Sequence, residues 1–320
     1  LARDGRQGDS HLVRELSSRA WGKLVPEQKG DLWEVANAVP IIGQDVADFH
    51  QIAALSTGVP LLGVLKADAD HMGLIISHGL PGRTFAIGET LSRAIHWFFG
   101  PYLNELAQEL TAKWRQSLDE EKKEYLDKEK IDPTKLESIF YVVYAGGDDL
   151  FLLGPWDWTV RLALRLAQSF KEYTCRNPVF SLSAGLIFVK PHFPVHQFAR
   201  LAEEALKQAK EERNRLCIWG TSLPWVKAQE LMDLGEQWYE RIRKGKLRRS
   251  LLGDLVRLSR QYRDPGRGRQ PMFTPQLYYM LVRRLPTWSK NERDELAQRI
   301  KCLEHIEIPA TWALWKTRRI

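Results

Sequence analysis

The sequence predicts an α+β fold in which a domain of mixed strands and helices is followed by an all-α helical bundle. Two apolar runs rich in β-branched and aromatic residues flank a Gly-Gly-Asp-Asp turn, as in a β-hairpin. Strand-like and helix-like stretches alternate from Pro60 to Gly220, and beyond Gly220 the apolar residues recur only with helical spacing. We therefore expect a mixed domain over residues 60–220, a helical domain over 221–320 and a connector over 1–59.

The composition is that of a globular protein with a mild preference for polyanionic partners. At 320 residues and 44% apolar content, the chain is long enough for about two domains with real cores. The formal charge is +7 and the isoelectric point is near 9.2, which favours a polyanionic partner. No apolar run approaches the roughly 20 residues of a membrane span, and the polar start lacks the apolar core of a signal peptide. We expect a cytoplasmic protein without membrane contact.

Residues 1–59 carry no pattern to which we assign a function. A short helix is expected over 10–24, and glycine and proline interrupt the segments after it. Asp45, Asp48 and His50 are metal-ligating residue types, but no matching partner is evident, so a solvated loop is the preferred interpretation. Because the chain begins with a polar, Gly-rich stretch and not with Met, we expect it to be part of a longer protein.

The first strand of the mixed domain is expected between Pro60 and Asp70. Its nearly continuous apolar run is typical of a buried central strand, and the run ends in acids. Such a strand delivers a carboxylate at its C-terminal end. Asp68 is therefore the first candidate ligand for a cation, and Asp70 lies two residues beyond it.

The remaining elements of the mixed domain follow from periodicity. Between Ile87 and about Leu118 the apolar residues fall mostly on one helical face, and the charged run 119–135 is expected to be an exposed helix end and connector. After the hairpin we expect a helix over 158–173, a strand over 180–189, a helix over 195–213 and a short strand over 216–219.

The Gly-Gly-Asp-Asp turn carries the chemistry. Gly146 and Gly147 permit a backbone that Cβ atoms would obstruct and let a large ligand approach. Asp148 and Asp149 place two carboxylates at the hairpin tip, where they repel unless a cation lies between them or one is protonated. Hard cations with oxygen ligands, Mg²⁺ or Mn²⁺, are the expected partners. Alone, the motif is more often a plain turn.

The order of elements makes the turn more specific. The predicted order β-α-β-β-α-β-α-β is the split β-α-β plan of a ferredoxin-like palm, with the hairpin beside the first strand. Asp68 at a strand end would then face the two acids of the hairpin. Palm-type polymerases and nucleotide cyclases use this arrangement, in which two metal ions clamp a nucleoside triphosphate and activate a ribose 3′-hydroxyl.

The part after Gly220 is expected to form a small helical bundle. Amphipathic stretches start near Trp225, Leu251, Gln276, Asn291 and Ala310. Residues 241–270 contain eleven Lys and Arg against Asp254 and Asp264, which is compatible with a surface that binds RNA phosphates. A solvated helix face is an equal alternative.

Three stretches together resemble the second palm domain of the large subunit of type III CRISPR effector complexes, with the Csm-like subtype as the closer match. They are Lys66 to Gly73, Tyr144 to Asp157 and Ala202 to Lys210. The resemblance implies synthesis of cyclic oligoadenylates from ATP when the complex holds a target RNA. It also implies guide RNA, target RNA and sister CRISPR subunits as partners. The family's nuclease motif, zinc-bearing insert and first palm have no counterpart in this sequence.

Site residues carry over by position from this resemblance. It implies that Asp68, Asp148 and Asp149 hold Mg²⁺ or Mn²⁺ and that the last two are catalytic. Asp70 is either a further ligand or a residue that holds the loop. Nucleotide contacts are implied for Gly146, Gly147 and Lys210. The family's Gly-Arg-Asn after the lysine is replaced here, so either Arg213 or Arg215 inherits the phosphate contact.

A departure from the cyclase pattern bears on the base. Cyclases that use GTP carry an Asn where this chain has Ile76 or Ser77, so we expect ATP as the substrate. Two alternatives remain open at this point. One is a catalytically silent palm that serves as a scaffold for RNA binding and complex assembly, although the complete set of acids argues against it. The other is a signalling cyclase that uses GTP, which would not need the basic helical domain.

Overall fold

The computed structural model describes residues 35–79, 84–264, 268–269, 272–285, 289–302 and 305–318. The helix expected over 10–24 lies outside these residues. Within the described part, no helix combines the length and apolar character needed to cross a bilayer.

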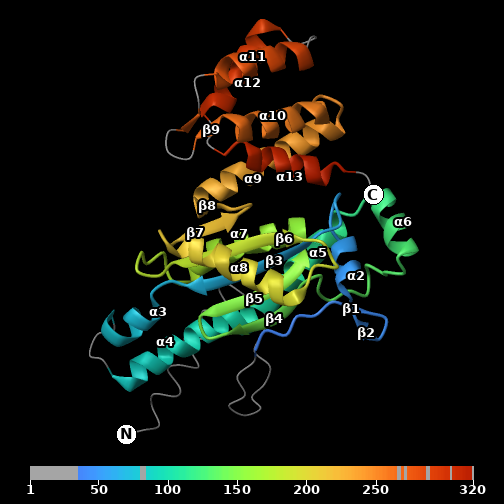
Figure 1. Ribbon diagram of the computed structural model, residues 1–320. Helices are drawn as coiled ribbons and strands as arrows, with labels where there is room; N and C mark the ends of the chain where they lie inside the picture. The colour runs from blue at the N-terminus through green and yellow to red at the C-terminus, as the bar shows by residue number, and fades with distance from the viewer. Residues whose placement is uncertain are drawn as a thin grey trace. The chain divides into compact units, whose positions relative to one another are not determined.

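A six-stranded sheet with the order β4-β5-β3-β6-β7-β8 forms the centre of the domain that we call the sheet domain, residues 35–224 (Figure 1). The strands are β3 Leu62–Ala69, β4 Tyr141–Gly146, β5 Asp149–Pro155, β6 Leu182–Val189, β7 Arg215–Ile218 and β8 Thr221–Pro224. Strand β3 is antiparallel to both β5 and β6, and β7 is parallel to β6. The hairpin β4–β5 therefore lies beside the first strand, as predicted, whereas β8 is an additional strand that carries the sheet past the expected boundary at residue 220.

The helices of the sheet domain confirm those predicted near 87–118, 158–173 and 195–213, the first with an interruption. Those after β3 are α3 Met72–Leu74, η1 Ile75–Gly79, α4 Phe85–Trp97, η3 Phe98–Tyr102, α5 Leu103–Gln116, α6 Glu120–Lys128, α7 Trp156–Tyr173 and α8 Val195–Lys210. The helix expected over 87–118 is divided by the wide turn η3, which contains Pro101. Proline has no N–H to donate, so a wider turn accommodates it inside a continuous helical path.

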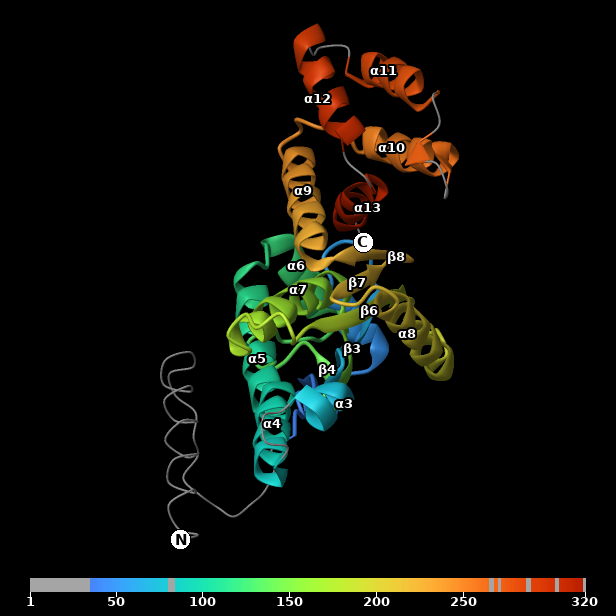
Figure 2. The ribbon, with the colours of Figure 1, turned by 90° about the vertical axis from the view of Figure 1, so that its left-hand side faces the viewer.

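The two faces of the sheet are covered by different helices. Figure 2 shows α5 and α7 on one side of the sheet and α8 on the other. Because side chains alternate along a strand, Gly63 and Leu65 of β3 face α7, whereas Leu62 and Val64 lie in a cluster with Phe198 of α8. The same alternation puts Lys66 and Asp68 on the α8 side, since they continue the series of even-numbered residues.

Residues 41–54 correct the expected connector. They form β1 Ile41–Ile42, β2 Asp45–Val46 and α2 Phe49–Ala54. A capping box between Asp48 and Gln51 begins α2, and Ile52 is fully buried against the sheet. The predicted solvated loop is therefore partly a helix of the core. His50, which had no partner in the sequence, lies with its Nε2 atom 3.3 Å from Nδ1 of His192.

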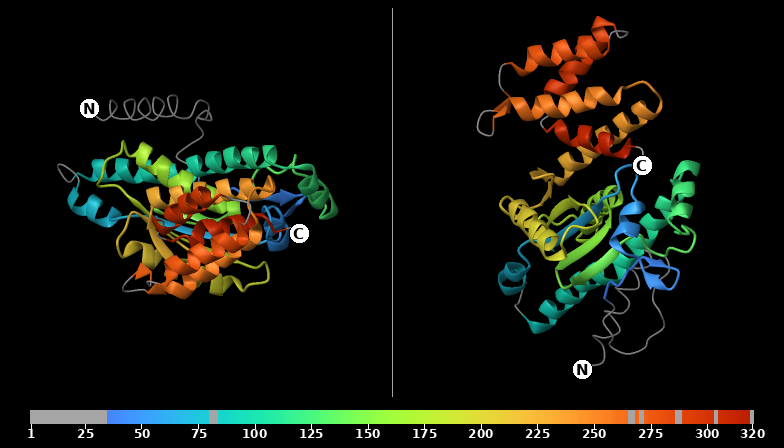
Figure 3. Two further views of the ribbon diagram at one scale, coloured as in Figure 1. Left: turned by 90° about the horizontal axis from the view of Figure 1, so that it is seen from above. Right: turned by 45° about the vertical axis from the view of Figure 1, so that its right-hand side comes forward.

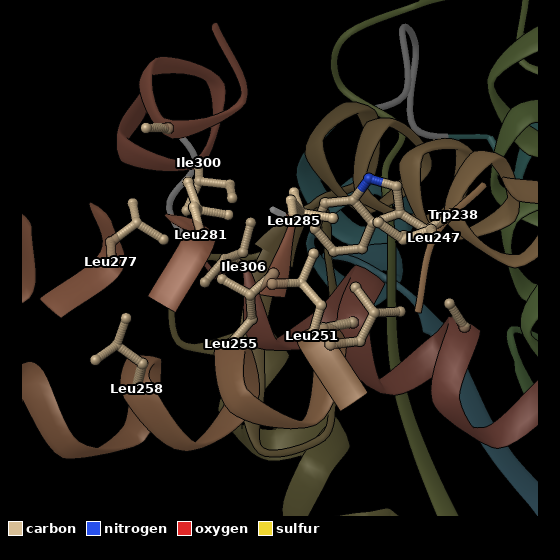
Figure 4. Close-up of a cluster of buried hydrophobic side chains, with 14 of the residues drawn as sticks. Trp238, Leu247, Leu251, Leu255, Leu258, Leu277, Leu281, Leu285, Ile300 and Ile306 are labelled. Atoms are coloured by element: carbon tan, nitrogen blue, oxygen red, sulfur yellow. The ribbon is translucent and has the colours of Figure 1, made fainter. Parts of the chain in front are cut away.

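The helical domain contains the five predicted helices, and Figure 3 shows them grouped together as the orange to red part of the ribbon. They are α9 Trp225–Arg243, α10 Arg249–Tyr262, α11 Phe273–Arg284, α12 Lys290–Cys302 and α13 Glu307–Lys316, with the short strands β9 Arg263–Asp264 and β10 Gly268–Arg269 after α10. Leu251, Leu255, Leu281 and Ile300 point into a shared apolar cluster (Figure 4). This domain therefore has a core of its own.

Helix α13 joins the helical domain to the sheet domain. The backbone N–H of Val59, just before β3, donates to the carbonyl of Trp315 at 3.0 Å, and the rings of Trp156 and Trp312 are 5.0 Å apart. The Glu236 carboxylate of α9 accepts from Lys316 Nζ at 2.7 and 2.9 Å and from Trp312 Nε1 at 2.9 Å. An ion pair between a buried lysine and a partly exposed glutamate thus links α13 to α9.

We expect Glu236→Ala to lower the free energy of unfolding by about 2 kcal/mol, because it leaves the buried ammonium of Lys316 and the indole N–H of Trp312 without an acceptor. Urea denaturation followed by tryptophan fluorescence measures the change. The matched control is Glu230→Ala in the same helix, which removes only an exposed pair with Lys227. Equal losses in the two variants would contradict the assigned role of Glu236.

Candidate active site

Three carboxylates converge where β3 ends beside the β4–β5 turn. Asp68 and Asp149 are directly opposite in the antiparallel register of β3 and β5, and residues opposite each other point to the same face of a sheet. The backbone N–H of Ala69 donates to the carbonyl of Asp148 at 2.8 Å, which ties the turn to the end of β3. The structure therefore brings Asp68 to two adjacent acids, the first of which lies 80 residues further along the chain.

The glycines of the turn leave this end of the sheet open. Gly147 has a φ of +62°, in the left-handed region, and a Cβ atom there would meet nothing within 4 Å. A Cβ atom on Gly146 would meet the Tyr144 side chain at 3.6 Å. The pairing register of β4 shifts between Val142 and Tyr144, an irregularity that bends a strand. The backbone angle at position 147 therefore favours glycine. The space where its Cβ would lie is open to a ligand.

Helix α8 supplies the cation nearest to the acids. Lys210, in its last turn, places Nζ 2.7 Å from Oδ1 of Asp68. Lys207 lies on the same face one turn earlier, and Glu203 lies there two turns earlier. The Glu203 carboxylate pairs with Lys66 of β3 at 2.5 Å. The family resemblance implied that Lys210 contacts a triphosphate; in this structure its partner is the Asp68 carboxylate.

Burial and the neighbouring charges both act on the pKa of Asp68. Burial raises the pKa of the Asp68 carboxyl above its usual value; Lys210 opposes this by hydrogen bond and charge, and Asp148 and Asp149 raise the pKa further. A set of hard carboxylate oxygens with this mutual repulsion suits Mg²⁺ or Mn²⁺. Among the residues that the structure describes, however, no three metal-ligating side chains already form a closed cluster. The donor chemistry therefore fits a divalent ion, and Lys210 is the cation that touches Asp68 here.

Asp70 is occupied by internal hydrogen bonds. Its two oxygens accept from Ser181 Oγ at 2.7 Å, Ser183 Oγ at 2.8 Å and the backbone N–H of Asn214 at 3.1 Å. The side chain is almost fully buried. These contacts favour the second of the two predicted roles, in which Asp70 holds the loop after β3 against β6 and the loop before β7. Sequence reasoning did not identify the two serines, because nothing local links them to an acid more than 100 residues away.

The two candidate arginines have partners of their own. Arg213 lies in the left-handed region with a φ of +58°, and its Nη1 atom is 2.6 Å from Nε2 of His71. Arg215 pairs with Glu212. Both guanidinium groups thus lie in or beside the loop that Asp70 anchors, and Arg213 reaches the start of α3.

The segment expected to contact the base follows α3. Ile75 is buried, whereas Ile76 is 43% exposed. The Ser77 hydroxyl donates to the carbonyl of Gly73 and contacts Nδ1 of His78, each at 2.7 Å. The segment therefore exposes the apolar side chain of Ile76 beside the polar side chains of Ser77 and His78.

A scan of protein families matches residues 61–217 to the second palm domain of Cas10/Cmr2. Among curated proteins, the chain is 31% identical over 225 residues to the CRISPR system single-strand-specific deoxyribonuclease Cas10/Csm1 (subtype III-A) of Methanocaldococcus jannaschii. That match covers 64% of this chain and 26% of the relative. The chain therefore spans about a quarter of the length of this relative.

Solved structures give the same fold. A Csm1–Csm4 cassette in complex with one ATP is similar with a TM-score of 0.64 and 25% identity, over 89% of this chain and 40% of that one. A cassette in complex with pppApApA is similar with a TM-score of 0.63 and 25% identity, over 87% and 41%. These likenesses confirm the predicted palm and extend over most of the helical domain.

Proposed function

Residues 61–217 belong to the Cas10/Cmr2 second palm domain family, and on that premise we propose that the chain is a metal-dependent nucleotidyltransferase that makes cyclic oligoadenylates from ATP within an RNA-guided type III CRISPR complex. The observation that carries the proposal is the register that sets Asp68 opposite Asp149, with Asp148 bonded to the end of β3. A similar Csm1–Csm4 cassette is named for its complex with ATP and another for its complex with pppApApA, which supports adenine nucleotides as ligands.

The chain's own residues have distinct proposed roles. Asp68, Asp148 and Asp149 would hold Mg²⁺ or Mn²⁺, which when bound activates a ribose 3′-hydroxyl and neutralises the triphosphate. Lys210 and Arg213 would contact the triphosphate from the end of α8. Gly146 and Gly147 leave room for it at the turn. Asp70 positions the loop that carries Arg213 through its bond to Asn214.

Partners beyond the nucleotide belong to the same proposal. The solved neighbours are Csm1–Csm4 cassettes, and we infer a comparable sister subunit, guide RNA and target RNA for this chain. The helical domain is the proposed RNA-facing part. Its arginines are not all available, however: Arg257 pairs with Asp254, and Arg249 donates to the carbonyl of Leu314. Arg248 is exposed and is the better candidate for a phosphate contact.

The assembled complex is expected to use ATP at least about tenfold better than GTP. Binding of GTP would bury hydrogen-bond donors of guanine for which the side chains of Ile75 and Ile76 offer no acceptor. Each donor left unsatisfied costs roughly 1–3 kcal/mol of binding free energy. The measurement is incorporation of labelled ATP or GTP by the full-length protein with its sister subunit, Mg²⁺ or Mn²⁺ and target RNA.

Three outcomes separate the candidate functions. Oligoadenylate formation with preference for ATP supports the proposal. Equal use of GTP would contradict the adenine assignment and favour a signalling cyclase. If the folded protein assembles with RNA but forms no nucleotide product, the result would favour the catalytically silent scaffold.

A further inference from the structure

We propose that Lys210 is a resident counter-ion of the acidic site: it neutralises Asp68 while no nucleotide is bound, and it gives up that contact when a divalent ion and ATP bind. The inference rests on the proposed function, because it concerns the same site. It adds a second role for a lysine whose expected partner was the triphosphate alone.

The contacts of the site support this role. The Nζ atom of Lys210 is 2.7 Å from Asp68 Oδ1, which is hydrogen-bond distance for a charged pair. The side chains are 35% and 24% exposed, so water and ions reach the pair. Lys66, the lysine of β3 on the same face, is already held by Glu203. Lys207 is also directed to Glu203 at 3.8 Å, which leaves Lys210 as the lysine of this face that pairs with an acid of the site, Asp68.

Electrostatics explains why the resting site uses a counter-ion. Asp149 lies opposite Asp68 in the strand register, and the backbone of Asp148 is bonded to the end of β3, so their carboxylates gather at one end of the sheet. A nearby cation lowers this mutual repulsion. Lysine suits an exchangeable contact because its ammonium is a point charge on a flexible stem, without the fixed fork of arginine.

The place of Lys210 at the end of α8 explains why its side chain can change partners. It belongs to the last turn of α8, and the backbone of that helix is held closely to β6 at Gly185. The stem therefore starts from a fixed point beside Asp68 while its end stays accessible. When ATP binds, the triphosphate offers Lys210 a new anion, and Asp68 becomes free for the divalent ion. Binding of metal and binding of nucleotide should then favour each other.

The test is the affinity of the full chain for Mn²⁺ without nucleotide, measured by electron paramagnetic resonance of free Mn²⁺. In Lys210→Met we expect Mn²⁺ to bind about three- to tenfold more tightly than in the unmodified chain, since a partly exposed ion pair no longer competes. In Lys207→Met, which removes the same charge one turn earlier, the affinity should stay within about twofold. In Lys210→Arg, which keeps the charge, the gain should be absent.

A second measurement gives an effect of opposite sign. Lys210→Met should weaken binding of a non-hydrolysable ATP analogue even though it strengthens binding of Mn²⁺, and general loss of structure cannot produce both changes. Mn²⁺ affinity in Lys210→Met no higher than in Lys207→Met would overturn the counter-ion role.

Asp68→Asn separates this inference from the proposed function. If Asp68→Asn abolishes Mn²⁺ binding and Lys210→Met leaves it unchanged, the metal site stands and only the role of Lys210 is wrong. If Asp68→Asn binds Mn²⁺ as well as the unmodified chain, the metal site itself is wrong and both proposals are overturned.

Discussion

Replacing Asp148 and Asp149 together by Ala is expected to lower oligoadenylate synthesis by about a thousandfold or more. Bound metal supplies several kcal/mol of transition-state stabilisation, and its loss translates into a factor of this size. Asp68 would remain, but one carboxylate paired with Lys210 is not a two-metal site. The measurement is product formation from labelled ATP by the assembled complex with target RNA.

The fold should survive this change. Both side chains are partly exposed at the hairpin tip, and removing two like charges beside Asp68 relieves repulsion. Thermal unfolding should therefore show no loss of stability. The control is Glu120→Ala with Glu121→Ala, which removes two adjacent acids from the exposed start of α6 and should keep full activity. Normal synthesis by the Asp148 and Asp149 variant would contradict the assignment of the site.

Gly185→Ala should destabilise the sheet domain by about 3 kcal/mol or more. A Cβ atom at this position of β6 would lie 2.3 Å from the backbone nitrogen of Leu206 and 2.7 Å from the carbonyl oxygen of Ala202. Backbone atoms of a packed helix cannot move aside as a flexible side chain can. Helix α8 would have to shift away from the sheet, and Lys210 would move with it. Urea denaturation measures the loss, and Mn²⁺ or nucleotide binding reports the displaced lysine.

Gly253→Ala is the matched control for that variant. Gly253 is exposed within α10, and a Cβ atom there meets nothing within 4 Å. Alanine is the better helix former by roughly 0.5–1 kcal/mol, so this substitution should stabilise the protein slightly. A similar small gain from Gly185→Ala would show that α8 does not pack on β6 as closely as described.

Local patterns predicted most elements of the fold. The continuous apolar run before Asp68 predicted β3, and the spacing of apolar residues predicted α7, α8 and the helices after Gly220, because periodicity records which face of an element is buried. The pair of glycines predicted the turn, and Gly147 indeed has a positive φ. The same patterns missed α2, since a six-residue helix is too short to show a clear period.

Long-range partners could not be read from local patterns. Nothing near Asp70 in the sequence indicated that Ser181, Ser183 and Asn214 would take up its oxygens. Likewise, His50 met its partner His192 only through the packing of α2 beside the loop after β6.

The sequence by itself determined the elements, their order and the acids that they carry, because residue types and spacing are local properties of the chain. The predicted order of elements also implied that Asp68 faces the acids of the hairpin, whereas only the tertiary structure decided which cation meets Asp68. The antiparallel register set Asp149 opposite Asp68, and the close approach of α8 at Gly185 brought Lys210 to Asp68 rather than leaving it in solvent. Which carboxylates are neutralised, and by what, depends on distances of a few ångströms between distant segments, and Coulomb energies change steeply over those distances.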